Sequence, residues 1–221
     1  MTATLFDFDG VLVDSEPLHL AAFNDVLERW GRHIDPRMYV ERYLSLDDAG
    51  VFRSVLGTPD RPVDASTLDR LIEAKSARVM EHLASHVPAY SGATEIVARR
   101  ATLGPVGIVS GALRREIALA LERMGVLGFV GFVVSAESTA MSKPHPAPYL
   151  AALEELRRRD HRGTVVAIED SIGGIQSAKS AGLRCVAVAH TYEAAALAAA
   201  GADDVAPDLS SLSDSLIEGR L

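Results

Sequence analysis

The sequence predicts an α/β fold, in which a parallel sheet has helices on both faces and is interrupted near its start by a helical insert. After residue 86, short apolar stretches alternate with amphipathic helical stretches, as in parallel sheets whose two faces are both covered. Residues 3–8 form another short apolar stretch, whereas residues 17–86 show only helical patterning. The opening strand has no partner near it in the sequence, so we expect it to join the later strands. This gives a sheet domain of residues 1–16 and 87–221 and an inserted helical domain of residues 17–86.

The insert is expected to hold four helices. In the first, Leu20, Phe23, Leu27 and Trp30 recur at helical spacing, and Gly31 can end the helix. The other expected elements are a helix over 36–44, a helix from 47 or 48 to 56, a loop over 58–64, and a long helix whose apolar face runs from Leu68 through Lys75 to Leu83. Consecutive helices of this kind indicate a separate module rather than part of a sheet.

The sheet domain is expected to alternate strands with helices. The strands are predicted over 3–8, 105–109, 129–134, 164–168, 184–189 and 203–206. The helices are predicted over 91–103, 113–124, 146–158, 172–181 and 193–200. Ser91 is a suitable N-cap for the first of these helices. Tyr149, Leu150, Leu153 and Leu156 are expected to face inward from the third.

Composition restricts the kind of partner. The 221 residues carry a formal net charge of -8, so we expect an acidic surface and no nucleic-acid partner. The apolar stretches fall short of the roughly 18 residues of a membrane span, so no membrane association is expected. Cys185 is the single cysteine and no signal-peptide pattern is visible, which together predict a cytoplasmic location. The oligomeric state stays open, and a monomer is compatible with the composition.

Polar side chains stand at the ends of three predicted strands. They are Asp7 and Asp9 at the end of the first, Ser110 and Gly111 after the second, and Glu169 and Asp170 after the fourth. Parallel strands place their carboxyl ends on one edge of the sheet, where ligands bind in open α/β folds. Helical sequence follows each strand, so free backbone amides and the positive ends of helix dipoles are expected at the same edge.

The residue types at this edge favour a hard cation and phosphoryl chemistry. Carboxylate and hydroxyl oxygens are ligands that Mg²⁺ prefers, whereas the seven histidines are scattered and lack the spacing of a zinc site. Lys143 lies in a loop stiffened by the prolines on either side of His145, and it can balance the charge of a phosphoryl group. One acid can attack phosphorus while the acid two residues on handles the proton of the leaving group.

The chain resembles the haloacid dehalogenase superfamily, in the helical-cap subgroup of phosphatases and β-phosphoglucomutase-like proteins. The resemblance covers essentially the whole chain, because four motifs stand in the order of the superfamily. They are residues 7–15 (DFDGVLVDS), 109–111 (VSG), 143–146 (KPHP) and 169–174 (EDSIGG). The resemblance implies a Rossmann-like core, an inserted α-helical cap domain and Mg²⁺-dependent action on phosphate esters.

The resemblance also implies a role for each motif residue. Asp7 would be the nucleophile that forms an aspartyl-phosphate, and Asp9 the general acid and base. Asp7, the backbone carbonyl of Asp9, Asp170 and Glu169 would form the Mg²⁺ site. Ser110 and the amide of Gly111 would hold the phosphoryl oxygens, and Lys143 would balance their charge. Members that act as dehalogenases lack the second acid and need no metal, so the presence of Asp9 favours phosphate esters.

The insert gives fewer indications of the substrate. β-Phosphoglucomutases of this subgroup carry an Arg for the second phosphate where this chain has residues 45–48, Ser-Leu-Asp-Asp. We interpret Asp47 and Asp48 as a helix N-cap. His19 and Lys75 resemble cap residues of the mutases and are candidate contacts to the substrate.

The leading hypothesis is therefore a phosphatase of a small phosphorylated metabolite, such as a sugar phosphate or phosphoglycolate. The alternative is a β-phosphoglucomutase-like enzyme. A third hypothesis is a receiver-like phospho-acceptor module, which would have no use for a helical insert above its acidic edge.

Overall fold

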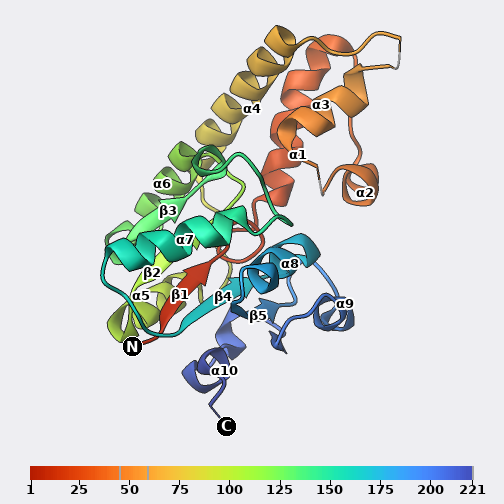
Figure 1. Ribbon diagram of the computed structural model, residues 1–221. Coiled ribbons are helices and arrows are strands. Elements are labelled where there is room, and N and C mark those ends of the chain that lie inside the picture. Colours follow the sequence, from red (N-terminus) through yellow and green to blue (C-terminus); the bar gives the residue numbers. More distant parts are fainter. Residues whose placement is uncertain (45, 59, 221) are drawn as a thin grey trace. The chain divides into compact units, whose positions relative to one another are not determined.

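The chain forms two compact units, residues 1–14 with 87–221 and residues 15–86, as the computed structural model in Figure 1 shows. The structure describes residues 1–44, 46–58 and 60–220. Ser45 of the acidic loop and Pro59 of the expected loop 58–64 lie outside the described residues. The first expected boundary, between 16 and 17, falls slightly later than the observed division between 14 and 15. The second expected boundary, between 86 and 87, is the same as the observed one.

A parallel sheet of six strands forms the larger unit, in the order β3-β2-β1-β4-β5-β6. The strands are β1 (Ala3–Phe6), β2 (Val106–Val109), β3 (Phe132–Val134), β4 (Val165–Glu169), β5 (Arg184–Val188) and β6 (Asp204–Ala206). β1 lies between β2 and β4, so the first strand of the chain is central in the sheet. Its residues Ala3–Phe6 are buried, as a central strand with both faces covered requires.

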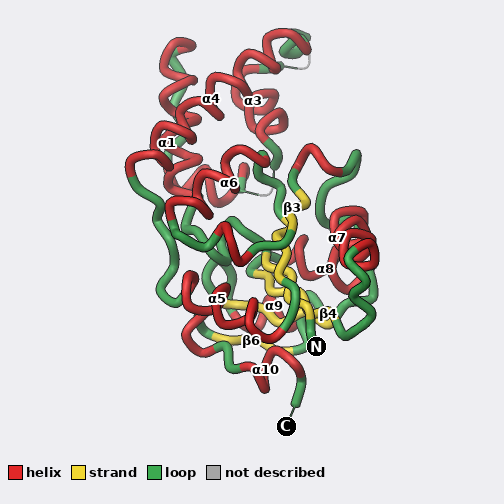
Figure 2. Tube along the Cα trace, turned by 90° about the vertical axis from the view of Figure 1, so that its left-hand side faces the viewer, coloured by secondary structure: helices red, strands yellow, loops and turns green. Residues whose placement is uncertain are grey.

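Helices cover both faces of this sheet, which confirms the predicted fold class (Figure 2). They are α5 (Ala93–Leu103), α6 (Arg114–Arg123), α7 (Ala147–Arg158), α8 (Ile172–Ser180), α9 (Ala194–Ala199) and α10 (Asp214–Glu218). On one face, α7, α8 and α9 pack against the strands through an apolar cluster that includes Leu5, Tyr149, Ile175 and Leu197. α5 and α6 lie on the opposite side of the strands (Figure 2).

The smaller unit is helical. Its helices are α1 (Glu16–Leu27), α2 (Pro36–Met38), α3 (Asp48–Leu56) and α4 (Ala65–Ser85), with a π-helical turn over Tyr39–Tyr43 and a 3₁₀ turn over Glu28–Trp30. Phe23 and Phe52 meet edge to face in its apolar core, with ring centroids 5.2 Å apart. The side chain of Asp47 accepts a hydrogen bond from the amide of Gly50 at 2.7 Å, so the predicted N-cap is confirmed there.

Two apolar side chains expected to face inward are exposed instead. Trp30 is 53% exposed because α1 ends at Leu27 and the tighter 3₁₀ turn rotates the following residues off the buried face. Leu150 is 48% exposed because it follows Tyr149 directly, and neighbouring helix positions do not share a face.

An expected cap and an expected strand start in the sheet unit also differ, and one helix was not predicted. Ser91 does not cap α5, because Gly92 occupies the N-cap position with a φ of +85°. The strand expected over 129–134 begins at Phe132, because residues Leu127–Phe129 form a 3₁₀ turn. α10 was not predicted, because a helix of five residues is too short to show a clear periodicity. Its N-cap is Ser213.

The two segments that connect the units run side by side within the larger unit. Val13 and Ala89 form an antiparallel bridge. The amide of Asp14 donates to the carbonyl of Pro88 at 2.8 Å, and the amide of Tyr90 donates to the carbonyl of Leu12 at 3.0 Å. The chain therefore leaves the sheet unit and returns to it at neighbouring points.

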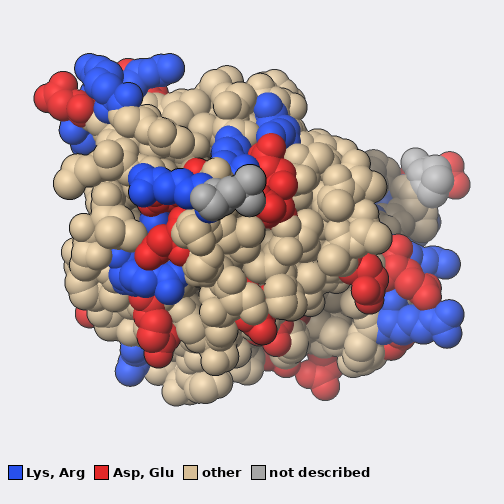
Figure 3. All heavy atoms as spheres, turned by 90° about the horizontal axis from the view of Figure 1, so that it is seen from below, with Lys and Arg blue, Asp and Glu red and all other residues tan. Residues whose placement is uncertain are grey.

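Acidic and basic groups are mixed on the surface drawn in Figure 3. Lys and Arg atoms lie next to Asp and Glu atoms on that face, so opposite charges neutralise one another over short distances. None of the helices in the described part of the chain combines the length and the apolar composition that crossing a membrane requires.

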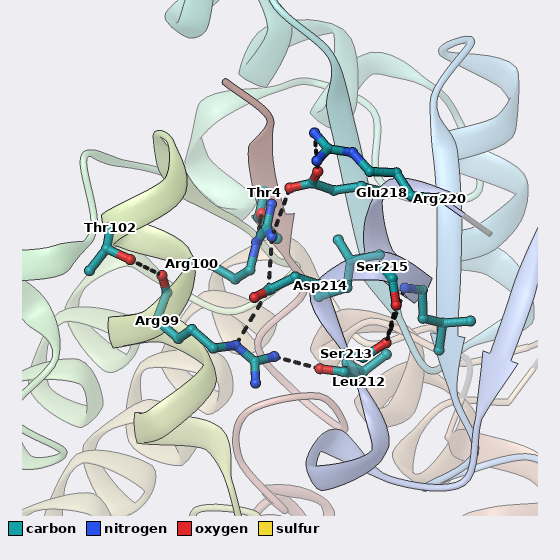
Figure 4. A network of polar contacts seen from close by, with 12 residues as sticks. Thr4, Arg99, Arg100, Thr102, Leu212, Ser213, Asp214, Ser215, Glu218 and Arg220 are labelled. Atoms are coloured by element: carbon teal, nitrogen blue, oxygen red, sulfur yellow. Dashed lines mark hydrogen bonds and ion pairs between the residues drawn. The ribbon is translucent and has the colours of Figure 1, made fainter.

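A buried arginine connects α5 to the C-terminal helix and to β1 (Figure 4). The Arg100 side chain is fully buried, and its Nε donates to Oγ1 of Thr4 at 2.9 Å. Its Nη1 contacts carboxylate oxygens of Asp214 at 3.0 Å and of Glu218 at 3.1 Å. These contacts place α10 on the same side of the sheet as α5.

Replacing Arg100 by methionine should lower the free energy of unfolding by about 1–2 kcal/mol, because the buried Thr4 hydroxyl loses its donor. Asp214 and Glu218 each lose one cationic partner and keep another, Arg99 and Arg220 respectively. Urea unfolding measures this change. Arg158→Met is the matched control, since Arg158 contacts Glu155 with 66% of its side chain exposed and should leave the midpoint unchanged. An unchanged midpoint in Arg100→Met would contradict the stabilising role of the network.

Candidate active site

Three carboxylates gather at the carboxyl ends of the two central strands. Asp7 follows β1, Glu169 is the last residue of β4, and Asp170 comes next. One carboxylate oxygen from each of the three lies within 4.8 Å of the others, and all three residues are buried. Phe6 pairs with Ile168, so the parallel register of β1 and β4 brings these chain positions together.

Lys143 connects this cluster to β2. Its Nζ lies 3.0 Å from Oδ1 of Asp7 and 2.7 Å from Oε1 of Glu169. It also donates to the carbonyl of Val109 at 2.9 Å. Oδ1 of Asp7 accepts a further hydrogen bond from the amide of Phe8 at 2.7 Å. The ammonium group thus sits among two acids and a strand-end carbonyl.

Glu169 is held from several sides. Besides Lys143, the hydroxyl of Tyr149 donates to its Oε1 at 2.6 Å, and Oγ of Ser171 donates to its Oε2 at 3.3 Å. A Cβ at Gly174 would lie 1.9 Å from Oε2, so the close approach of α8 requires a residue without a side chain there.

Asp170 is held by the loop after β5. The hydroxyl of Thr191 donates to Oδ2 of Asp170. Gly10 has a φ of +75°, and a Cβ there would lie 2.1 Å from the same oxygen, so the conformation and the contact both require glycine. His190 contacts the Gly10 carbonyl through Nδ1 at 2.9 Å, and its ring stacks on Tyr90 with centroids 3.9 Å apart.

Asp9 and Ser110 form a separate pair beside the cluster. Oγ of Ser110 donates to Oδ2 of Asp9 at 3.1 Å and accepts from the amide of Ala112 at 2.9 Å. Gly111 is exposed at the start of the turn that precedes α6. The Asp9 side chain is not one of the three that converge, and it is less buried than Asp7.

Burial and mutual repulsion raise the pKa of two of the acids. Asp7 has a pKa well above the usual value because it is buried beside Glu169, and Lys143 offsets this only in part. Burial, and then Glu169, raise the pKa of Asp170 to about 7, against the opposing effect of the Thr191 hydrogen bond. Burial alone would lower the pKa of Lys143, but Asp7 and Glu169 raise it above its usual value.

This donor set fits a hard divalent cation. Asp7, Glu169 and Asp170 offer oxygen ligands close together, and the ammonium group of Lys143 contacts two of these acids. Repulsion between neighbouring carboxylates is relieved when a cation binds between them. Oxygen-only ligands of this kind are typical of Mg²⁺.

His19 and Lys75 come together within the helical unit. Nζ of Lys75 lies 2.7 Å from Nδ1 of His19 and 2.9 Å from Oδ1 of Asp48, and it lies 4.9 Å from the ring centroid of Phe23. The side chain of Lys75 is only 3% exposed. The charge of Lys75 is therefore already matched by Asp48.

Sequence reasoning missed two residues that contact the cluster. Thr191 follows the fifth strand, and the rule that strand ends converge would have found it had it been applied to that strand. Tyr149 was expected only as an inward-facing residue of a helix. The one signal for its contact with Glu169 is that a buried tyrosine hydroxyl usually needs a partner.

Comparison with known proteins shows the family to which this chain is similar. Residues 4–188 match the family model described as haloacid dehalogenase-like hydrolase. A phosphorylated carbohydrates phosphatase of Thermotoga maritima is 29% identical over 91% of this chain and 92% of its own length. Hexitol phosphatase B of Escherichia coli K12 is 30% identical over 84% of this chain and 82% of its own length.

Two solved structures share the fold. CbbY from Rhodobacter sphaeroides, in complex with phosphate, superimposes with a TM-score of 0.83 at 24% identity and covers 98% of each chain. A β-phosphoglucomutase from Clostridium difficile gives a TM-score of 0.81 at 19% identity, covering 99% of this chain and 96% of its own.

The metal-free protein should lose stability as the pH rises from about 4 to about 7. In this window folded Asp170, with a pKa of about 7, binds a proton that the unfolded chain has released, so the free energy of unfolding falls with pH. Thermal unfolding in a chelator measures this. Asp170→Asn should flatten the slope, whereas Asp160→Asn, on a side chain 96% exposed, should not. Stability that rises through the window would contradict the shift.

Proposed function

The chain belongs to the haloacid dehalogenase-like hydrolase family, and on this premise we propose that it is a Mg²⁺-dependent phosphatase of small phosphorylated metabolites. Its relatives named above are phosphatases, and the chain is a phosphoric monoester hydrolase. Their names point to a phosphorylated carbohydrate or sugar alcohol, and phosphoglycolate belongs to the same size class. The observation that carries the proposal is the contact of Lys143 with Asp7 and Glu169 inside the acidic cluster.

In the first step, a carboxylate oxygen of Asp7 attacks phosphorus and the ester P–O bond breaks. Asp9 gives its proton to the departing alkoxide oxygen, so the leaving group departs as a neutral alcohol. Lys143 stays protonated and balances charge on the transferring oxygens. The Ser110 hydroxyl and the amide of Gly111 hold the phosphoryl group.

In the second step, water attacks the aspartyl-phosphate. Asp9, now ionised, takes a proton from that water, the acyl–phosphate bond breaks, and inorganic phosphate leaves with Asp7 regenerated. Asp9 is only partly buried, which suits a residue that must exchange protons with substrate and water.

Asp7, Asp170, Glu169 and the backbone carbonyl of Asp9 would hold Mg²⁺. The ion supplies positive charge that stabilises the transferring phosphoryl group.

We assign residues 15–86 the role of a cap domain that excludes bulk water during the reaction. A buried, unpaired thiol at Cys185 fits the cytoplasm.

Asp7→Asn should lower phosphate release by about a thousandfold or more, because it removes the attacking carboxylate. The measurement is release of phosphate from a panel of sugar phosphates and phosphoglycolate with Mg²⁺, and a chelator should abolish it in the wild type. Asp160→Asn, at an exposed turn with a φ of +58°, is the matched control and should retain activity. Undiminished turnover in Asp7→Asn would exclude the mechanism, and stable labelling by acetyl phosphate without hydrolysis would favour the receiver-like alternative.

A mutase is the second candidate, because His19 and Lys75, which contact each other in the helical unit, resemble cap residues of the mutases. A phosphomutase must bind two phosphates, yet the charge of Lys75 is matched by Asp48. We therefore expect β-glucose 1-phosphate to be hydrolysed rather than isomerised.

Phosphorus NMR with and without added glucose 1,6-bisphosphate distinguishes the two activities. We expect inorganic phosphate as the product in both cases. Accumulation of glucose 6-phosphate that increases with the bisphosphate would establish the mutase instead.

A further inference from the structure

One oxygen of Glu169 is shared by two donors of different character. Oε1 accepts from Nζ of Lys143 at 2.7 Å and from the hydroxyl of Tyr149 at 2.6 Å. Tyr149 has no exposed surface, and Glu169 has none either. The contact therefore lies inside the apolar cluster between α7 and the sheet rather than at the surface.

We propose that Tyr149 is a positioning residue of the active site, which fixes Glu169 through its hydroxyl and thereby keeps Lys143 in reach of Asp7. The proposal rests on the function proposed above, because it assigns Tyr149 a place behind the acids of that site. Tyr149 would not touch substrate.

The proposal rests on competition between Glu169 and Asp7 for the ammonium group of Lys143. An ammonium group has three protons, and the contacts of Lys143 are to Val109, Asp7 and Glu169. A buried carboxylate attracts every donor within reach, because each unmet lone pair is costly away from water. With the Tyr149 hydroxyl present, Oε1 of Glu169 has a second donor and attracts the ammonium group of Lys143 less strongly. Without that hydroxyl, Lys143 should shift toward Glu169 and away from Asp7.

Tyr149 also contacts Lys143 directly. Nζ of Lys143 lies 5.4 Å from the centroid of the Tyr149 ring, within the range of a cation–π contact. One side chain therefore contacts the acid through its hydroxyl and the lysine through its ring. Phenylalanine would keep the ring contact and lose only the hydrogen bond, so Tyr149→Phe isolates the hydroxyl.

The other contacts of Glu169 show why the Tyr149 hydroxyl matters for its orientation. Oγ of Ser171 supports the other oxygen at the longer distance of 3.3 Å, and Gly174 lets α8 approach without a side chain. The hydroxyl of Tyr149 donates to Oε1 at the shorter distance of 2.6 Å. A fixed donor favours one orientation of the carboxylate, which would in turn fix how Glu169 faces a bound cation.

The test compares Tyr149→Phe with Tyr39→Phe. The hydroxyl of Tyr39, also buried, donates to Oε2 of Glu16 at 2.7 Å in the helical unit, so the same atom is removed from the same kind of hydrogen bond. Three quantities are measured for each variant: Mg²⁺ affinity by calorimetry without substrate, the urea midpoint in a chelator, and kcat with KM.

For Tyr149→Phe we expect Mg²⁺ affinity and kcat each to fall about tenfold or more, with KM little changed. Tyr39→Phe should leave Mg²⁺ affinity and kcat at wild-type values. In a Glu169→Gln background, Tyr149→Phe should change Mg²⁺ affinity much less than it does in the wild type, because the residue it acts through is altered.

The proposal would be overturned if Tyr149→Phe kept the Mg²⁺ affinity and kcat of the wild type. This includes the case in which its urea midpoint falls, as in Tyr39→Phe, while Mg²⁺ affinity and kcat do not change. An equal effect of Tyr149→Phe in the Glu169→Gln background would overturn it as well. A wild-type protein that neither binds Mg²⁺ nor releases phosphate would instead overturn the proposed function, and this inference with it.

Discussion

Repulsion between Asp7, Glu169 and Asp170 is the constraint on which the larger unit depends. Their oxygens lie within 4.8 Å of one another in a buried setting. The chain holds them there because β1 and β4 are neighbours in register, so both strands end at the same level. Apolar packing on the two faces of the sheet supplies the stability that such a cluster opposes. The sheet therefore holds together the acids of the proposed cation site.

The donors around each acid give chemically similar groups different properties. They are Phe8 and Lys143 at Asp7, Ser110 at Asp9, Lys143, Tyr149 and Ser171 at Glu169, and Thr191 at Asp170. Phe8, Ser110, Ser171 and Thr191 follow strand ends, whereas Lys143 lies in the loop before α7 and Tyr149 in α7 itself. The sheet edge thus brings together groups that are distant in the sequence, and these different surroundings support the separate roles proposed for Asp7 and Asp9.

How far the sequence predicts this structure depends on the range of the interaction. Buried strands, the Asp47 cap and the convergence of Asp7 with Glu169 and Asp170 follow from local patterns and from the geometry of parallel sheets. The Tyr149 contact depends on where a helix packs, which no local pattern specifies. Gly92 replaced the expected cap because a positive φ, not a side-chain oxygen, sets the entry into α5.

The paired connecting segments have a consequence for how the chain is assembled. Because Asp14 and Pro88 are hydrogen-bonded neighbours, residues 15–86 form one long insertion whose two ends leave the larger unit at adjacent points. The entropic cost of bringing the ends of such an insertion together depends only weakly on its length. Helical modules of different size could therefore be exchanged at this position during evolution without disturbing the register of the sheet.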